Sequence, residues 1–135
     1  MYPEILLPGC RVRVQRKFTF LYADTMNGRL DQLLEFLKEH PADPFLTYAV
    51  ATEYLKLHDT AKALHYYEQL VKEHPDYVGT YYHLGKLYES LNRVSEALNT
   101  YEAGMRAARL AHDAHALREL QAARQWVLDQ EEEEE

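Results

Sequence analysis

Apolar side chains recur every three or four positions along residues 28–130, the spacing that places them on one face of an α-helix. Leu30, Leu33, Leu34 and Leu37 form the first of these apolar stripes. Prolines and short polar turns separate six segments of this kind. The pattern predicts helices over residues 28–40, 44–57, 61–74, 77–91, 94–110 and 114–130.

The pattern has a fixed period of 34 residues. The sequence Lys-Glu-His-Pro at positions 38–41 returns at positions 72–75. The same offset superposes Tyr48 on Tyr82, Tyr54 on Tyr88, Ala63 on Ala97 and Tyr67 on Tyr101. A fixed period of this length indicates a stack of paired helices, in which each pair buries its apolar face against its neighbours. We therefore predict an all-α solenoid of antiparallel helix pairs.

Turn and capping residues mark the helix ends. Pro75 ends the third helix, and Asp59 or Thr60 is expected to cap that helix at its start. Asn92 suits the left-handed conformation that often follows a helix, and Asp113 is expected to cap the sixth. The fifth helix has no proline at the position equivalent to Pro75, so we expect it to continue for one more turn.

Residues 1–25 do not share the period. Residues 11–20 alternate apolar and polar side chains as a short strand does, but no second strand is available to pair with it. We expect a poorly ordered N-terminal segment (1–25), a helical repeat domain (26–130) and an acidic tail (131–135). The tail is predicted to be a disordered, solubilising end, or alternatively an attractor of basic partners. Met26 directly precedes the periodic region, which raises the hypothesis that translation starts there.

Charge narrows the classes of partner. The net charge is −7, of which Glu131–Glu135 contribute −5 and residues 1–25 contribute +2. An acidic body disfavours nucleic acid and favours basic or neutral partners. No apolar run reaches the length of a membrane span, so no membrane association is predicted. A single cysteine, Cys10, excludes an internal disulfide and suits a reducing compartment, so cytoplasmic location is expected.

The period and its residue pattern resemble the tetratricopeptide repeat (TPR) family, in particular its small bacterial members. The resemblance covers two full repeats, residues 44 to about 110, flanked by half-repeat and capping helices. Thr47 stands where the family's early aromatic falls, and Arg109 where its second proline falls. The matching small and aromatic residues are Ala51, Tyr54, Ala63, Tyr67, Pro75, Tyr81, Gly85, Tyr88, Ala97 and Tyr101.

The resemblance implies a concave groove, lined by the first helix of each pair, that holds a peptide. The residues at the groove positions are Phe45, Tyr48, Thr52, Leu55, Tyr82, Lys86 and Glu89. Tyr48 and Tyr82 are the strongest candidates for contact with a peptide. The other interpretation is that these two tyrosines pack against neighbouring helices. Some family members grip a terminal carboxylate with basic residues, but the corresponding positions here carry Tyr48, Thr52 and His83. We therefore expect no binding of acidic chaperone tails.

The sequence gives little support for catalysis or metal binding. There is no Gly-rich phosphate loop, no nucleophile elbow and no CxxC motif, so no catalytic residue, cofactor or enzyme activity is predicted. His112, Asp113 and His115 suggest a metal site only weakly, and no metal is predicted. Carboxylates on the predicted helices are expected to be solvated surface charges, such as Glu53, Glu68, Glu89 and Glu102.

We predict a protein-protein interaction module, or scaffold, that binds a peptide or protein segment in the groove. One alternative is a structural homodimer in which the groove or the open end of the stack closes on a second copy. A metal-binding or enzymatic role is the third hypothesis.

Overall fold

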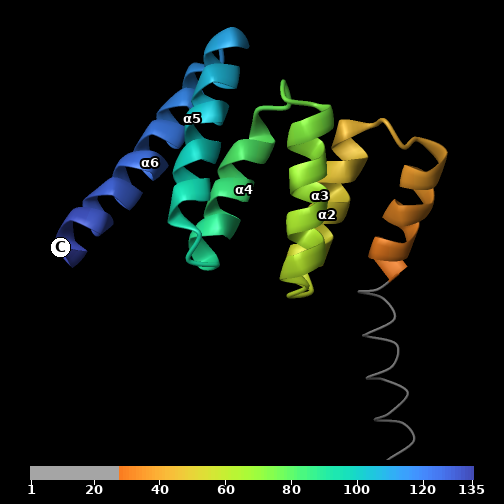
Figure 1. Ribbon diagram of the computed structural model, residues 1–135. Coiled ribbons are helices and arrows are strands. Elements are labelled where there is room, and N and C mark those ends of the chain that lie inside the picture. The colour runs from red at the N-terminus through yellow and green to blue at the C-terminus, as the bar shows by residue number, and fades with distance from the viewer. Residues whose placement is uncertain (1–27) are drawn as a thin grey trace, which may run out of the picture.

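A computed structural model describes residues 28–135, and this part of the chain contains six helices and no strands. The first helix occupies residues 28–39. It is followed by α2 (Pro44–Lys56), α3 (Thr60–Glu73), α4 (Gly79–Ser90), α5 (Val94–Leu110) and α6 (Ala114–Glu134). Figure 1 shows the helices arranged across the molecule in the order of the sequence. The predicted all-α fold is confirmed, whereas the expectations for residues 1–25 and Met26 fall outside the described residues.

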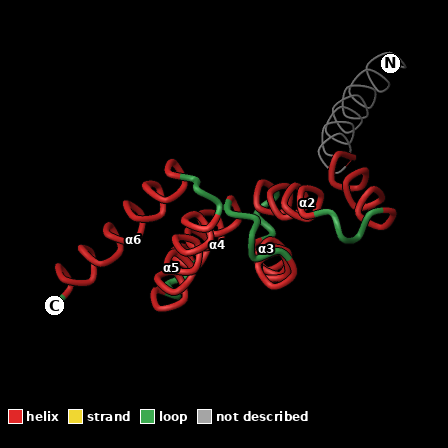
Figure 2. Tube along the Cα trace, turned by 90° about the horizontal axis from the view of Figure 1, so that it is seen from above, coloured by secondary structure: helices red, strands yellow, loops and turns green. Residues whose placement is uncertain are grey.

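The helices form two layers. In Figure 2, α2, α4 and α6 lie in one row, with α3 and α5 in a second row against them. Each helix from α2 to α5 packs on the next, and α4 also contacts α6. The first helix joins this stack through Leu30, which is buried, and through an ion pair of 3.2 Å between Arg29 Nε and Glu53 Oε1 of α2.

Three of the turns are built alike. His58, Asn92 and His112 follow α2, α4 and α5 with φ angles of 59°, 57° and 54°. In each turn the N–H of the next residue donates to a carbonyl in the last turn of the helix, at 2.9 Å, as in a Schellman motif. The left-handed conformation predicted for Asn92 is therefore confirmed, and the two histidines share it.

Aspartates start the helices that follow two of these turns. Asp59 Oδ1 accepts a hydrogen bond of 3.2 Å from the Lys62 N–H, and Asp113 Oδ1 accepts one of 2.9 Å from the Ala116 N–H. These bonds satisfy amide groups that have no partner within the helix. Of the two caps considered for the third helix, Asp59 is therefore the one used.

Three helices test the predicted boundaries. Helix α5 has 17 residues against 14 in α3, which confirms the extra turn. Helix α4 starts at Gly79 and not at residue 77, because the Tyr77 N–H still belongs to the preceding turn and donates to the His74 carbonyl. Helix α6 continues to Glu134, so the prediction that it ends near residue 130 and leaves the acidic run disordered was wrong.

Large tyrosine rings pack against very small residues at the helix crossings. Tyr67 and Tyr101 are both fully buried. A Cβ atom added to Gly85 would overlap the Tyr101 ring, and one added to Gly104 would lie 2.5 Å from Tyr81 Cβ. The close approach predicted at Gly85 is therefore present, and Gly104 provides a second one that was not predicted. The other small residues at these crossings, Ala51, Ala63 and Ala97, are fully buried, as expected.

Carboxylates predicted to be solvated instead join successive helices. The Tyr88 hydroxyl donates to Glu68 Oε1 at 2.6 Å, and the Arg124 guanidinium donates to Glu102 Oε1 at 3.0 Å. These two contacts are equivalent in the repeat, but the partners are 20 residues apart in the first and 22 in the second. The longer α5 therefore shifts α6 by two residues relative to the 34-residue period.

Candidate functional site

One face of the molecule carries an unbroken line of side-chain contacts from α2 to α6; we call it the α2–α4–α6 face. On this face the Tyr48 ring contacts His83, with 5.6 Å between ring centroids, and His83 contacts Tyr82 at 5.7 Å. Lys86 Nζ then lies 6.0 Å from the Tyr82 ring and 5.2 Å from the Trp126 ring of α6. The structure thus brings three of the predicted groove residues, Tyr48, Tyr82 and Lys86, onto one face.

The α2 end of this face is an aromatic cluster that is partly buried. Tyr48 contacts the Tyr67 ring at 6.1 Å and the Tyr77 ring at 5.8 Å. His83 stacks on Tyr67 with an angle of 8° between the ring planes. Burial lowers the pKa of His83 below its ordinary value, so its imidazole is neutral at pH 7. The side chains of this part of the face are therefore aromatic and uncharged.

The remaining α2 residues of the predicted groove have different surroundings. The Thr52 hydroxyl donates to the Tyr48 carbonyl at 2.9 Å and shares a hydrogen bond of 3.1 Å with the Tyr67 hydroxyl. Leu55 is half-buried and packs against the core. Phe45, by contrast, is 62% exposed. Thr52 and Leu55 therefore support the helix crossing, and Phe45 is the α2 side chain most available to a partner.

Glu89 connects the α2–α4–α6 face to the core through a hydrogen bond and an ion pair. It accepts a hydrogen bond from the buried Tyr101 hydroxyl and forms an ion pair of 3.2 Å with Lys86. Burial, and then the hydrogen bond to the Glu89 carboxylate, raise the pKa of Tyr101. The hydroxyl of Tyr101 therefore keeps its proton and holds Glu89 in one position, which in turn positions Lys86.

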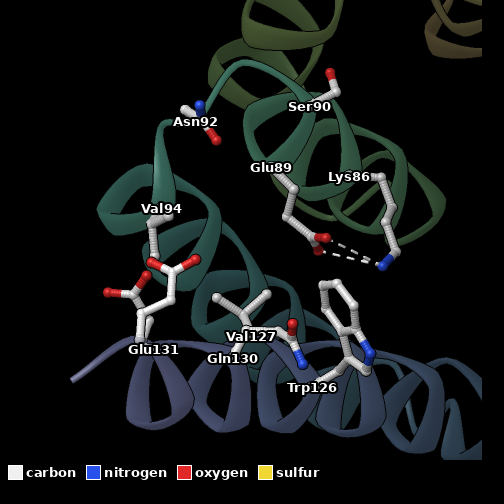
Figure 3. A pocket seen from close by; sticks show the side chains of 10 residues that line it. Lys86, Glu89, Ser90, Asn92, Val94, Trp126, Val127, Gln130 and Glu131 are labelled. Atoms are coloured by element: carbon white, nitrogen blue, oxygen red, sulfur yellow. Dashed lines mark hydrogen bonds and ion pairs between the residues drawn. The ribbon is translucent and has the colours of Figure 1, made fainter.

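A pocket of about 390 Å³ lies between α4 and α6 at the far end of this face (Figure 3). Lys86 and Glu89 line it from α4, and Trp126, which is 55% exposed, lines it from α6. The rest of its wall is formed by Ser90, Asn92, Val94, Val127, Gln130, Glu131 and Glu134. Sequence reasoning missed the α6 residues, because the two-residue shift after α5 removes them from the 34-residue register.

A second hollow of about 450 Å³ lies where the α3–α4 turn meets the end of α5. Tyr81 and Ala107 contribute to its wall, and Leu110 stands beside it with 84% of its surface exposed. The Tyr81 hydroxyl donates to the Pro75 carbonyl at 2.6 Å, which fixes the turn. Leu110 and Ala111, at the end of the longer α5, are also among the residues that line the hollow.

The candidate metal residues serve other purposes. Asp113 caps α6, and His115 Nε2 lies 3.6 Å from Glu119 on the same helix. Across residues 28–135, no three histidine, cysteine, aspartate or glutamate side chains are grouped as metal ligands would be. None of the helices described here combines the length and apolar character needed to cross a bilayer.

Comparison with known proteins identifies the family. A family model described as a tetratricopeptide repeat matches residues 54–124, more than half of the chain. A tetratricopeptide repeat domain protein from Salinibacter ruber, solved in solution by NMR, is 48% identical. The match covers 68% of this chain and 93% of that one, with a TM-score of 0.65. No curated protein matches this sequence. The chain belongs to the tetratricopeptide repeat family.

More distant structures share the fold. The TPR2B domain of yeast Sti1, in its complex with pHsp70, is 18% identical, with a TM-score of 0.71 over 89% of this chain and 95% of its own. The first TPR of Spaghetti (RPAP3), bound to the HSP90 peptide SRMEEVD, is 19% identical, with a TM-score of 0.61 over 84% and 89%. At these identities the similarity establishes the helical solenoid and nothing further.

Proposed function

We propose that this protein is an interaction module of the cytoplasm that binds a peptide or protein segment along the α2–α4–α6 face. The observation that carries the proposal is the unbroken line of contacts from Tyr48 to Trp126, which leaves aromatic surface exposed on successive helices. The proposed contact residues are Phe45, Tyr48, Thr52, Leu55, Tyr82, Lys86 and Glu89. We propose no catalytic role.

The distant structural neighbours support a binding role of this kind, because two of them hold chaperone-derived ligands. The ligand itself is expected to differ. Tyr48, Thr52 and His83 occupy the positions at which a carboxylate clamp would need basic residues, and His83 is neutral in its buried cluster. The peptide SRMEEVD, which the Spaghetti domain binds, is therefore proposed not to bind here.

Exposed aromatic side chains give the sharpest test of the site. Phe45→Ala/Tyr82→Ala removes aromatic contact surface and keeps the fully buried Tyr67 and Tyr101 unchanged. Leu110→Ala is the matched control, since it removes an exposed apolar side chain away from the face. A random nonapeptide phage library is panned against each folded variant, with circular dichroism confirming helix content. We expect enrichment of binders on the wild type and on Leu110→Ala, and its loss on the double variant.

Enrichment that survives in the double variant but disappears in Leu110→Ala would place the binding surface at the second hollow instead. That hollow and the exposed Leu110 also favour one alternative function, which is self-association of two copies through this apolar surface. Sedimentation equilibrium over a range of concentrations tests the alternative. A monomer at every concentration excludes it.

A further inference from the structure

We propose that the pocket between α4 and α6 binds an arginine or lysine side chain of a basic segment in a partner protein. This inference rests on the proposed function, since the pocket is the end of the α2–α4–α6 face. It adds the chemistry of the partner, which the face alone does not define.

Trp126 is the first reason. Trp126 is more than half exposed, although burying an indole is strongly favourable, and it lines one wall of the pocket. Lys86 already approaches this ring as a cation at 5.2 Å. An arginine guanidinium stacks on tryptophan faces in the same way, and its aliphatic stem would lie against Val127 and Val94. The pocket therefore offers an apolar wall and floor to a long cationic side chain.

The charges that line the pocket complement a cation. Its only ammonium group, Lys86, is paired with Glu89. Glu131 and Glu134 also line the pocket, and neither forms an ion pair with another residue in the described range 28–135. In Figure 3 the Glu131 carboxylate lies beside Val94, on the side of the pocket opposite Lys86. Two carboxylates are thus available to receive a basic side chain, and an acidic one would be repelled.

Helix α6 itself gains nothing from these carboxylates. The carboxyl end of a helix carries a partial negative charge, which favours basic residues there and disfavours acidic ones. The last turn of α6 contains no basic residue and is formed by glutamates. The positions of Glu131 and Glu134 therefore oppose the stability of the isolated helix, and a bound cation would remove that unfavourable interaction.

Trp126 also provides the measurement, because it is the only tryptophan of the chain. The probes are three synthetic nonapeptide pools with Arg, Met or Glu fixed at the central position and uncharged residues other than Trp elsewhere. Binding to the full chain is followed by Trp126 fluorescence and, independently, by calorimetry. Because each 1.4 kcal/mol is a factor of ten in affinity, one charge-assisted contact predicts about tenfold tighter binding of the Arg pool than of the Met pool. The Glu pool is expected to bind most weakly.

Two variants of equal charge separate the pocket from the general acidity of the chain. Glu131→Gln/Glu134→Gln changes two residues that line the pocket, and Glu132→Gln/Glu133→Gln changes two neighbours that do not. We expect the first variant to lose the preference for Arg over Met and the second to keep it. Equal losses in both variants would overturn the proposal, because they would assign the preference to long-range charge.

The pools also separate this inference from the proposed function. Equal binding of the Arg and Met pools overturns the inference and leaves the proposed function standing, whereas binding of no pool overturns both. Other occupants of the pocket give distinct results. Tighter Arg-pool binding by full-length Arg11→Gln/Arg13→Gln/Arg16→Gln/Lys17→Gln than by the wild type would assign the pocket to the chain's own basic segment. A Trp126 emission maximum that shifts with protein concentration in the absence of peptide would assign the pocket to a second copy, if Glu131→Gln/Glu134→Gln abolished the shift.

Discussion

The two full repeats place their large and small residues on opposite helices at the same helix crossing. In the repeat formed by α4 and α5, Tyr81 on the first helix lies against Gly104 on the second. At the equivalent positions, 34 residues earlier, the repeat formed by α2 and α3 has Thr47 and Leu70, both buried. Each repeat thus has one large and one small residue at these two positions, and the large one lies on opposite helices in the two repeats. The crossing therefore conserves total volume more closely than residue type, as close-packed interiors require.

The repeats also differ in how their buried tyrosines are satisfied. The Tyr67 hydroxyl shares a hydrogen bond with the hydroxyl of Thr52, a neutral partner. The equivalent Tyr101 lies against Gly85 and donates to the Glu89 carboxylate, which is paired with Lys86. The tyrosine of the first repeat thus has only a neutral hydrogen-bond partner, whereas that of the second is connected to a charged group on the α2–α4–α6 face.

The largest expected effect comes from giving the second repeat the large residue of the first. Gly104→Leu places side-chain atoms where Tyr81 Cβ already lies, so we expect a loss of about 3 kcal/mol or more in the free energy of unfolding. Adding Tyr81→Thr recreates the Thr47–Leu70 combination and should recover part of that loss. Urea denaturation of both single variants and the double variant measures the coupling. Strictly additive losses would show that the exchange of volumes is not what relates the two repeats.

An intermediate effect distinguishes the two tyrosines. Tyr101→Phe removes the hydroxyl that donates to the Glu89 carboxylate, so we expect a loss of about 1.5 to 3 kcal/mol, the range for hydrogen bonds to charged groups. Tyr67→Phe removes a bond between neutral groups and should cost about 0.5 to 1.5 kcal/mol. Thermal or urea unfolding at pH 7 makes the comparison, and equal losses would contradict it.

The pH dependence gives the same comparison a second readout. Burial and the Glu89 carboxylate raise the pKa of Tyr101 in the folded state, so the fold keeps a proton that the unfolded chain releases near pH 10. This contribution to stability is complete below pH 10 and is lost as the pH rises further. Melting temperatures from pH 8 to 11.5 should therefore fall less steeply for Tyr101→Phe than for the wild type.

The smallest effect is a gain in stability at the turns. His58 and His112 adopt the left-handed conformation, which costs a residue with a side chain about 1 kcal/mol relative to glycine. We expect His58→Gly and His112→Gly each to raise the free energy of unfolding by about 0.5 to 1 kcal/mol. Asn92→Gly is the internal control and should gain less, because asparagine tolerates this conformation. Destabilisation by all three changes would exclude this explanation of the turns.

The sequence predicted the helices and the register of the repeats well, because both follow from short-range patterns. Asp59, Asp113 and Asn92 act where local capping rules placed them. The partners of surface carboxylates depend on contacts between helices and were missed, as the bond between Glu68 and Tyr88 illustrates.

The candidate site divides in the same way. Tyr48 and Tyr82 lie on one face because the 34-residue period carries one onto the other. The position of Trp126 on this face could not be predicted, because the longer α5 shifts α6 out of the 34-residue register. The spacing of 22 residues between Glu102 and Arg124 would have revealed that change, but only once the equivalent pair at a spacing of 20 is known.

The position of α6 at the end of the stack has a consequence for motion. Helix α6 contacts α5 and α4, and its opposite side, with Arg118, Gln121 and Gln125, faces solvent. In a linear array the terminal unit opens at the cost of its own interface only. Amide hydrogens of α6 should therefore exchange through local openings, faster than those of α4, while the rest of the fold stays intact. The surface that includes Trp126 is therefore present only while α6 is packed against α4 and α5.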